Sequence, residues 1–400
     1  MSFVSTNRSS SQWGDTLSPH QRKAFRDICA CRTEALGARL EQCDHCSYQN
    51  IQFNSCRNRH CPKCQSTARD KWLARTAKEL LPVPYSHVVF TLPGRLSPLV
   101  LQNPKLIYAI LFRSVAETLL TIARDPRRLG ANLGFLAVLH TWSQKVLHHP
   151  HLHCLVPAGG LVPDRSRWIR CRGRFFLPGE VLRRMFRGKF LALLAAAFRR
   201  NKLRLSGQLR SLKRPEAFDR FLRDLRRLKW VVEARRPFGG PEQVLKYLAR
   251  YTHRVAISNG RLIEMRDGQV TFRWRDSADH NKQKLMALDA IEFMRRFLLH
   301  ILPTGFVKIR HFGFLANCNR GAALKLCATL LSAPVLQELL TDRQKSAIAR
   351  RCPCCGIGTL CVLGWVPAAI VNGPSVLVPD LVDSSCGFKR CPDITWAPEK

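Results

Sequence analysis

The sequence predicts an α+β protein in which a small cysteine-rich module precedes a larger body of strands and helices. Ser86–Leu92 is rich in β-branched and aromatic residues and stops at Pro93-Gly94, which is typical of a strand. Residues 104–124 repeat apolar side chains at helical spacing. Phe135–Gln144 and His151–Val156 have the pattern of two strands joined by a short turn, so we expect a sheet with packed helices.

The elements that follow continue this mixture. Residues 180–230 have the pattern of two or three basic amphipathic helices. Because the whole chain is so basic, we interpret their charged faces as a surface that binds along a DNA backbone; charged faces that only meet solvent are the alternative. Pro241–His253 is predicted to be a helix, with proline at its first position and Glu242 in its first turn. Val270–Arg275 and Phe306–Leu315 are predicted as further strands.

Changes in composition divide the 400 residues into three parts. Residues 1–70 hold most of the paired cysteines and are predicted to form an N-terminal zinc-binding module. Residues 71–325 form the main domain, with the basic helical insert at about 180–235. Residues 326–400 are rich in proline, cysteine and small apolar residues, and we interpret them as a C-terminal appendage.

The charge balance indicates a polyanionic partner. The chain has 65 Lys and Arg against 28 Asp and Glu, a formal net charge of +37, and nucleic acid is the first candidate to relieve that self-repulsion. The longest apolar run, Phe190–Phe198, is far shorter than the roughly 20 residues that span a membrane. The N-terminus has no apolar signal segment. We therefore expect a cytoplasmic, nucleoid-associated protein with no membrane partner.

Two C-x-x-C pairs separated by fourteen residues predict a structural zinc site. In a chain with 17 cysteines and no secretory signal, such pairs indicate reduced thiols and metal binding rather than disulfides. Each pair turns the backbone around the metal, and four thiolates complete a tetrahedral Zn²⁺ site. Two chance pairs in a cysteine-rich chain are the alternative. The predicted ligands are Cys43, Cys46, Cys61 and Cys64.

Other cysteines leave the ligand set open. Cys56 and His60 lie between the two pairs, and they could replace one ligand or build a second site with Cys29 or Cys31. Cys352-Pro-Cys-Cys355 has the form of another knuckle, but no second C-x-x-C completes it downstream. Ordinary cysteines are therefore the favoured interpretation there.

The segment from His148 to Val156 contains a pair of histidines suited to a metal ion. Alternate residues of a strand share a face, so His151 and His153 point the same way while Leu152 points to the core. Two imidazoles roughly 5–7 Å apart, as strand geometry places them, can chelate one divalent ion. A satisfied network of core histidines is the alternative.

A third ligand is available on the preceding strand, where His140, Trp142 and Gln144 share one face. If the two strands pair as a hairpin, Gln144 lies close enough to provide an oxygen ligand. Two nitrogens and one amide oxygen leave positions open for water and phosphate, which suits a catalytic ion better than a structural one.

Two tyrosines in the predicted helix are candidate nucleophiles. Tyr247 and Tyr251 are four residues apart, so both hydroxyls lie on one helix face. With a free pKa of roughly 10, a tyrosine attacks a phosphodiester only when a metal ion or cation stabilises its charge. Ordinary packing on an amphipathic helix is the alternative. Basic side chains close in sequence are available for phosphate contact: Lys246, Arg250 and Arg254.

Five ordered sequence blocks resemble the rolling-circle transposases of the HUH endonuclease superfamily, in their two-tyrosine insertion-sequence branch. The resemblance covers about residues 20–330. The blocks are NSCRNRHCPKCQ (54–65), HVVFTLP (87–93), TWSQ with HHPHLHCLVPAGG (141–160), YLARYTHRVAIS (247–258) and KIRHFGFLAN (308–317).

The resemblance implies a fold, a reaction and a role for each candidate. The fold is an HUH-type antiparallel sheet with packed helices and the metal histidines on a central strand. His151 and His153 are then the metal pair, and Gln144 is the third ligand of a Mg²⁺ or Mn²⁺ ion. Tyr247 and Tyr251 are the two nucleophiles. The implied reaction cleaves and rejoins single-stranded DNA at transposon ends and target through a 5′-phosphotyrosine.

Two other functions stay open. A non-enzymatic zinc-containing DNA-binding protein would have the same net charge, with the histidines and tyrosines in structural roles. A replication initiator or relaxase would use the same chemistry in another process. The N-terminal zinc module and the five blocks favour transposition.

Overall fold

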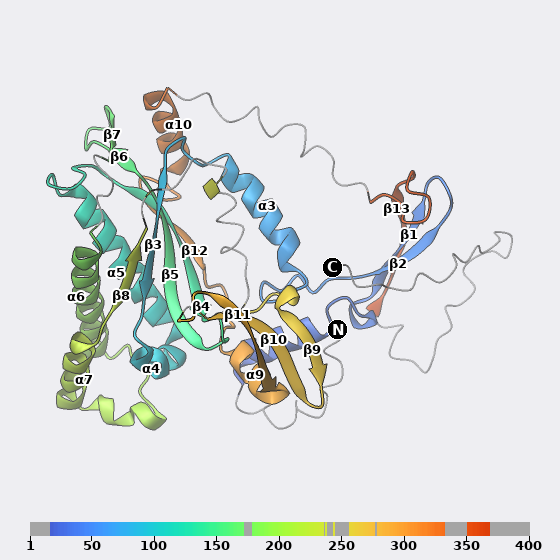
Figure 1. Cartoon of the computed structure of the whole chain (residues 1–400), viewed down its shortest axis with the longest axis horizontal. Helices are drawn as coiled ribbons and strands as arrows, with labels where there is room; N and C mark the ends of the chain where they lie inside the picture. Colours follow the sequence, from blue (N-terminus) through green and yellow to red (C-terminus); the bar gives the residue numbers. More distant parts are fainter. Residues whose placement is uncertain are drawn as a thin grey trace. The chain divides into compact units, whose positions relative to one another are not determined.

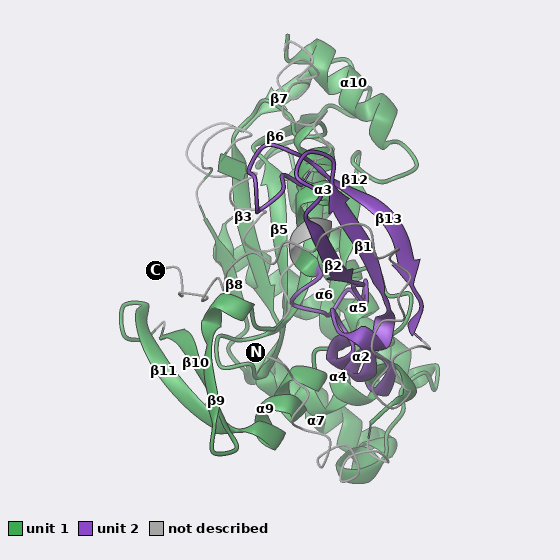
Figure 2. Ribbon diagram, turned by 90° about the vertical axis from the view of Figure 1, so that its right-hand side faces the viewer, with its two compact units in different colours: residues 1, 8–21, 65–336 green, residues 2–7, 22–64, 337–400 purple. Residues whose placement is uncertain are grey.

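The computed structural model describes residues 17–171, 178–235, 237, 243–244, 256–276, 278–332 and 350–368. They belong to two compact units (Figure 2). Of the described residues, unit 1 contains 17–21 and those between 65 and 332, and unit 2 contains 22–64 and 350–368. Unit 2 is therefore built from two segments that are far apart in the sequence.

The main element of unit 1 is a five-stranded antiparallel sheet with the strand order β12-β4-β5-β3-β8 (Figure 1). The strands β3 and β4 are buried along almost their whole length, which explains their nearly continuous apolar sequences. The bounds are β3 (Tyr85–Thr91), β4 (Gly134–Trp142), β5 (His148–Pro157), β8 (Val231–Ala234) and β12 (Ile309–Gly313).

Helices cover one face of this sheet. Alternate residues of β4 and β5, such as Phe135 and Leu152, belong to one buried cluster with Phe186 and Trp230. The helices on this side are α4 (Ser97–Gln102), α5 (Pro104–Arg124), α6 (Gly179–Arg199) and α7 (Pro215–Arg227). Among the described helices, α5 alone is long and apolar enough to cross a membrane, and 67% of its apolar stretch is buried inside the protein. Twelve of its residues are buried, as in a core helix.

The opposite face of the sheet carries a second apolar cluster and the histidines. Leu136, Val138 and Leu155 belong to this cluster. It also includes residues from α10 (Arg320–Leu330) and is bordered by α3 (Gln65–Ala77). Because side chains alternate along each strand, His140 and His153 project from this same face.

The other elements of unit 1 are smaller. A three-stranded antiparallel sheet, in the order β11-β10-β9, leads into α9, whose first turn is capped by the Asp289 carboxylate. Asp289 Oδ1 accepts from the backbone N–H of Ile291 at 2.8 Å. The bounds are β6 (Gly159–Leu161), β7 (Trp168–Arg170), β9 (Leu262–Arg266), β10 (Gln269–Asp276), β11 (Lys282–Asp289) and α9 (Ala290–Leu298). Short 3-10 helices occupy Glu34–Leu36, Gly94–Leu96, Gly207–Lys213 and Asn259–Arg261.

Unit 2 is a small antiparallel sheet with strand order β13-β1-β2 and the larger part of helix α2. The central strand β1 pairs with β2 on one side and with β13 on the other. The bounds are α2 (Pro19–Cys29), β1 (Ala38–Cys43), β2 (Gln49–Phe53) and β13 (Leu360–Val366). For residues 350–368 the expectation of a separate C-terminal appendage is corrected, since this segment completes the sheet of the N-terminal module.

The predicted α+β class, with an antiparallel sheet and packed helices, is confirmed. Helix α5 has the predicted bounds of 104–124, and the predicted strands are present with ends that differ by a few residues. Of the helix predicted at 241–253, only residues 243–244 are described, and both are helical.

A buried histidine anchors the turn between β4 and β5. His300 is 3% exposed, and its Nε2 donates to the carbonyl of Val146 at 3.1 Å. Its Nδ1 lies 3.2 Å from Thr141 Oγ1, which places the hydroxyl as the donor. Burial lowers the pKa of His300 to about 3, so the imidazole is neutral in the folded protein.

This histidine makes folding stability sensitive to acid. The unfolded chain binds a proton below pH 6.5 while the folded protein does not until about pH 3, so stability is fully present above pH 6.5 and falls below it. Between pH 7 and pH 5 we expect the wild-type protein to lose about 2 kcal/mol more than His300→Gln. Urea unfolding at both pH values measures this difference. Equal losses in the two proteins would contradict it.

Candidate functional site

Three histidines meet on the sheet face opposite helices α5 and α6. His140 on β4 lies directly across from His151 on β5, and His153 is two residues further along β5. Their ligand atoms all lie within 4.8 Å of one another, and the ring centroids are 4.4 to 5.4 Å apart. We call His140, His151 and His153 the histidine cluster. A single divalent ion fits between three nitrogens at such distances.

Neighbouring groups orient two of these rings. His151 Nδ1 donates to the backbone carbonyl of His149 at 2.6 Å, which leaves the Nε2 lone pair available to an ion. His153 Nδ1 lies 2.8 Å from Nε2 of His87 on β3, and the two rings are stacked at 5.1 Å. Outer partners of this kind hold a ligand in the tautomer that a metal requires.

The electrostatics of the site keep the imidazoles neutral. Burial lowers the pKa of His151 to about 4 and that of His153 well below its ordinary value of 6.5. Arg235 follows β8, donates its backbone N–H to the His87 carbonyl at 2.9 Å, and contributes to the lowered pKa of His87 and His153. Neutral rings suit a site that binds a metal ion, and the positive charge of Arg235 favours an anion at the same site.

The sequence predicts Gln144 as the third ligand, but in the structure His140, not Gln144, lies beside His151 and His153. Strand β4 ends at Trp142, and Gln144 is exposed in the turn beyond it. The Gln144 carbonyl accepts from the Arg261 guanidinium. The turn is closed by Ser143, whose hydroxyl accepts from the backbone N–H of Leu147 at 3.2 Å. The turn thus begins two residues earlier than predicted, and the resulting register sets His140, rather than Gln144, beside His151.

The residues of the predicted tyrosine helix lie outside the described residues. They are Lys246, Tyr247, Arg250, Tyr251 and Arg254. The preceding residue Val244 is described and fully buried, in the same apolar cluster as Leu136 and Leu155. These two leucines project from the sheet face that carries the histidine cluster.

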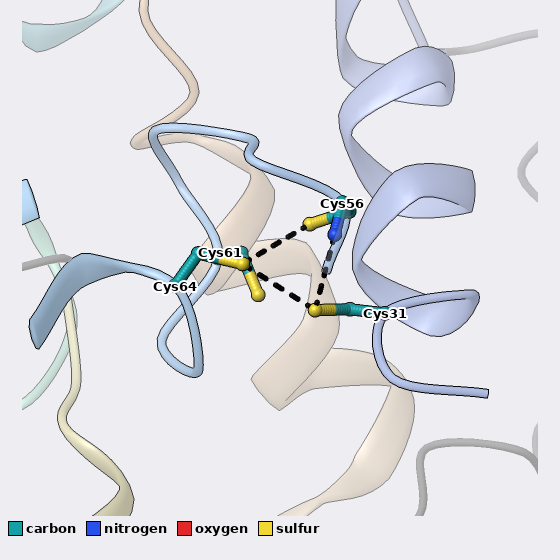
Figure 3. A group of neighbouring side chains, drawn as sticks. All are labelled: Cys31, Cys56, Cys61 and Cys64. Carbon is teal, nitrogen blue, oxygen red and sulfur yellow. Dashed lines mark hydrogen bonds between the residues drawn. The ribbon is translucent and has the colours of Figure 1, made fainter. Parts of the chain in front are cut away.

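The cysteines form two clusters, and neither is the predicted set. Cys61 and Cys64 do not meet Cys43 and Cys46. The first cysteine cluster consists of Cys31, Cys56, Cys61 and Cys64 (Figure 3). The second cysteine cluster consists of Cys43, Cys46, Cys352 and Cys355. The zinc ligand set is therefore corrected, because each pair takes its partners from another part of the chain.

The first cysteine cluster has the geometry of a closed zinc site. Cys64 Sγ lies 3.4 Å from Cys31 Sγ and 3.7 Å from Cys56 Sγ. A tetrahedral zinc with Zn–S bonds of about 2.3 Å separates its sulfurs by about 3.8 Å. Cys56, a candidate additional ligand, belongs to this cluster. His60 does not; its ring lies 3.3 Å from Arg59 Nε.

Helices α6 and α7 combine a buried apolar side with a basic exposed side. Phe186, Phe190 and Phe218 are buried in the main core, while Arg220 and Arg223 are exposed on α7. Residues 181–230 carry 16 Lys and Arg against 3 acidic residues. The exposed side is thus strongly positive, which suits a phosphate backbone.

Comparison with known proteins gives consistent matches along the chain. The sequence model of a family described as "Putative transposase" matches residues 134–322, and that of a "Transposase zinc-binding domain" matches residues 4–92. The putative transposase y4qJ of Sinorhizobium fredii is 51% identical over 355 residues, which cover 86% of this chain and 89% of the relative. The transposase for insertion sequence element IS801 of Pseudomonas savastanoi pv. phaseolicola is 31% identical over 309 residues, 72% and 69% of the two chains. No solved structure matches.

Proposed function

The chain belongs to the IS91-type family of transposases, and from this premise we propose that it cleaves and rejoins single-stranded DNA through a 5′-phosphotyrosine. The observation that carries the proposal is the histidine cluster, set on a central strand pair of an antiparallel sheet. A protein that only binds DNA has no need for three neutral, oriented imidazoles gathered at one point of its central sheet.

We assign the histidine cluster as the metal site of this reaction. His140, His151 and His153 provide three nitrogens and no carboxylate, a donor set that suits a transition-metal ion such as Mn²⁺ better than Mg²⁺. The chemistry that the bound ion supplies is polarisation of the scissile phosphate. His87 and the His149 carbonyl hold the rings in position, and Arg235, whose charge contributes to the lowered pKa of His153, is a proposed phosphate contact.

Tyr247 and Tyr251 are the proposed nucleophiles. The burial of Val244 on the histidine-bearing side of the sheet supports this, since in the helix that the sequence predicts over 241–253 Tyr247 follows it by three residues, close to one turn. The tyrosine oxygen attacks phosphorus, the bond from phosphorus to the 3′ oxygen breaks, and that oxygen leaves as a 3′-hydroxyl after taking a proton. The reverse attack by a 3′-hydroxyl joins strands without ATP, because the number of phosphoester bonds is unchanged. Lys246, Arg250 and Arg254 are proposed phosphate contacts.

The test is a covalent adduct. Purified protein is incubated with labelled single-stranded DNA that spans candidate ends, with Mn²⁺, and separated on a denaturing gel. We expect a protein–DNA adduct that survives denaturation and is absent when a chelator is added first. Salt-sensitive binding to every DNA without any adduct would overturn the proposal in favour of a non-enzymatic DNA-binding protein. Activity on plasmid origins alone would favour a replication initiator or relaxase.

The basic side of α7 is expected to contribute the salt dependence of DNA binding. Replacing Arg220, Arg223 and Arg227 together by glutamine should lower the slope of log affinity against log salt by about 2, at about 0.7 per single-strand phosphate contact. Arg113→Gln is the control, because Arg113 is already paired with Glu117 at 2.7 Å. Fluorescence anisotropy over a salt series measures the slope. An unchanged slope in the triple variant would show that this face does not meet the DNA.

A further inference from the structure

We propose that unit 2 binds a second structural zinc ion, which joins the segment 350–366 to the N-terminal module. Its four ligands are Cys43, Cys46, Cys352 and Cys355. The matched zinc-binding domain ends at residue 92, so it does not include two of these ligands. The proposal is independent of the nuclease chemistry assigned to unit 1.

The sulfur positions in this second cysteine cluster match a tetrahedral zinc site. Cys43 Sγ lies 3.7 Å from Cys355 Sγ, and Cys46 Sγ lies 3.6 Å from Cys352 Sγ. Both distances are close to the edge of about 3.8 Å that four thiolates make around one zinc ion. All four ligand atoms lie within 4.8 Å of one another. The first cysteine cluster, which lies wholly within the matched transposase zinc-binding domain, has similar sulfur distances of 3.4 and 3.7 Å.

Each half of the site is folded as a zinc knuckle. In the N-terminal half, the backbone N–H groups of His45 and Cys46 point at Cys43 Sγ, at 3.4 and 3.5 Å. In the C-terminal half, the N–H of Cys354 lies 3.3 Å from Cys352 Sγ and that of Gly358 lies 3.3 Å from Cys355 Sγ. Such N–H groups stabilise the thiolate form, which is the form that binds zinc.

The two knuckles are fitted to each other beyond the cysteines. The Asp44 N–H donates to the Thr359 carbonyl at 3.1 Å, and the Thr359 N–H donates to Asp44 Oδ1 at 2.8 Å. A Cβ at Gly358 would lie 2.4 Å from Cys43 Sγ and 2.7 Å from Asp44 Oδ1, so only glycine allows this approach. The contact thus requires a specific residue type on the C-terminal side.

Strand pairing and a buried carboxylate continue the same junction. Strand β13 pairs with β1 from Ala38↔Val366 to Cys43↔Leu360. Glu41 on β1 is 2% exposed, and its carboxylate lies 2.6 Å from Arg39 Nε and 3.3 Å from Arg350 Nη1. Burying a carboxylate without a positively charged partner costs free energy, so the ion pair with Glu41 favours the position of Arg350 beside β1. The proposed zinc site therefore lies at one end of an interface made of paired strands, hydrogen bonds and an ion pair, between segments more than 300 residues apart in the sequence.

The experiment counts zinc in the full chain, expressed with zinc and purified without chelator. Plasma mass spectrometry should find one zinc ion fewer per chain in the Cys352→Ser, Cys355→Ser double variant than in the wild type. The matched control, Cys318→Ser with Cys361→Ser, removes two exposed cysteines outside both clusters and should keep the wild-type zinc content. Equal zinc content in the double variant and the wild type would overturn the proposal.

Cobalt substitution keeps the proposal testable if the double variant fails to fold. Tetrathiolate Co²⁺ sites absorb strongly, so titration of the metal-free wild-type chain should reach its end point at two equivalents. An end point at one equivalent would contradict a second site. Limited proteolysis adds a structural readout, since chelation should release residues 350–366 to protease in the wild type. Protection that is unchanged by chelation would count against a joining role for the metal.

Discussion

Replacing His140 by alanine is expected to abolish metal-dependent cleavage of single-stranded DNA, while Gln144→Ala leaves it intact. Outer-shell substitutions at metal sites cost about 10–100-fold in affinity or activity, so loss of a direct ligand should exceed about 100-fold. His140 faces His151 across the strand pair, whereas Gln144 is exposed in the turn. Isothermal titration with Mn²⁺ and the adduct assay measure the two effects separately.

A series of variants makes this assignment specific. His87→Phe removes the partner of His153 Nδ1 but no member of the histidine cluster. Its loss of cleavage activity should therefore be larger than that of Gln144→Ala and smaller than that of His140→Ala. Each variant should retain DNA binding in the absence of metal, because the basic surfaces are unchanged. Full activity of His140→Ala, or inactivity of Gln144→Ala, would contradict His140 as the third ligand and favour Gln144 instead.

The double variant Tyr247→Phe, Tyr251→Phe is expected to form no covalent adduct at any metal concentration. Phenylalanine keeps the ring and removes only the attacking oxygen, so DNA and Mn²⁺ affinities should stay within about twofold of wild type. Each single variant should still form an adduct through the other tyrosine and fail to complete strand transfer. Denaturing gels with end-labelled DNA measure adduct and joined product together.

An adduct that persists in the double variant would contradict the nucleophile assignment. Peptide mapping of that adduct would then identify the residue that carries the DNA. The histidine cluster would be unaffected by this outcome, because a metal-polarised phosphate can be attacked by other side chains. The two predictions therefore fail separately.

Elements that depend on local pattern could be predicted from the sequence. The apolar repeat of 104–124 gives helix α5 at those bounds, and the alternation around His151 and His153 gives strand β5 with both rings on one face. These patterns succeed because helix and strand periods are properties of neighbouring residues.

The position of His140 beside His151 could not be predicted, because it depends on strand register. The predicted second strand begins at His151, directly after Pro150, and proline lacks the N–H that a central strand uses. In the structure Pro150 lies within β5 and contributes its carbonyl, which accepts from Leu92 N–H at 3.0 Å. The turn is therefore Ser143–Leu147, and a histidine rather than a glutamine lies opposite His151.

The full ligand sets of the two cysteine clusters could not be predicted from the sequence, for a different reason. The sequence shows which cysteines form knuckles, but spacing along the chain favours neighbouring pairs as partners. Cys43 and Cys355 are 312 residues apart, and only the tertiary fold joins them. The knuckle Cys352-Pro-Cys-Cys355 is completed by Cys43 and Cys46, which lie near the other end of the sequence.

The central position of β1 has a consequence for biosynthesis. Its outer neighbour β13 begins at Leu360, 317 residues after β1 ends at Cys43. At roughly 5–20 residues per second, a ribosome needs about 15–60 s to make that stretch. Throughout this time the nascent chain carries β1 with one open edge, a surface on which other strands can add. The sheet of unit 2 is completed only after translation has passed the whole of unit 1, so a chain cut short before residue 360 cannot complete this sheet.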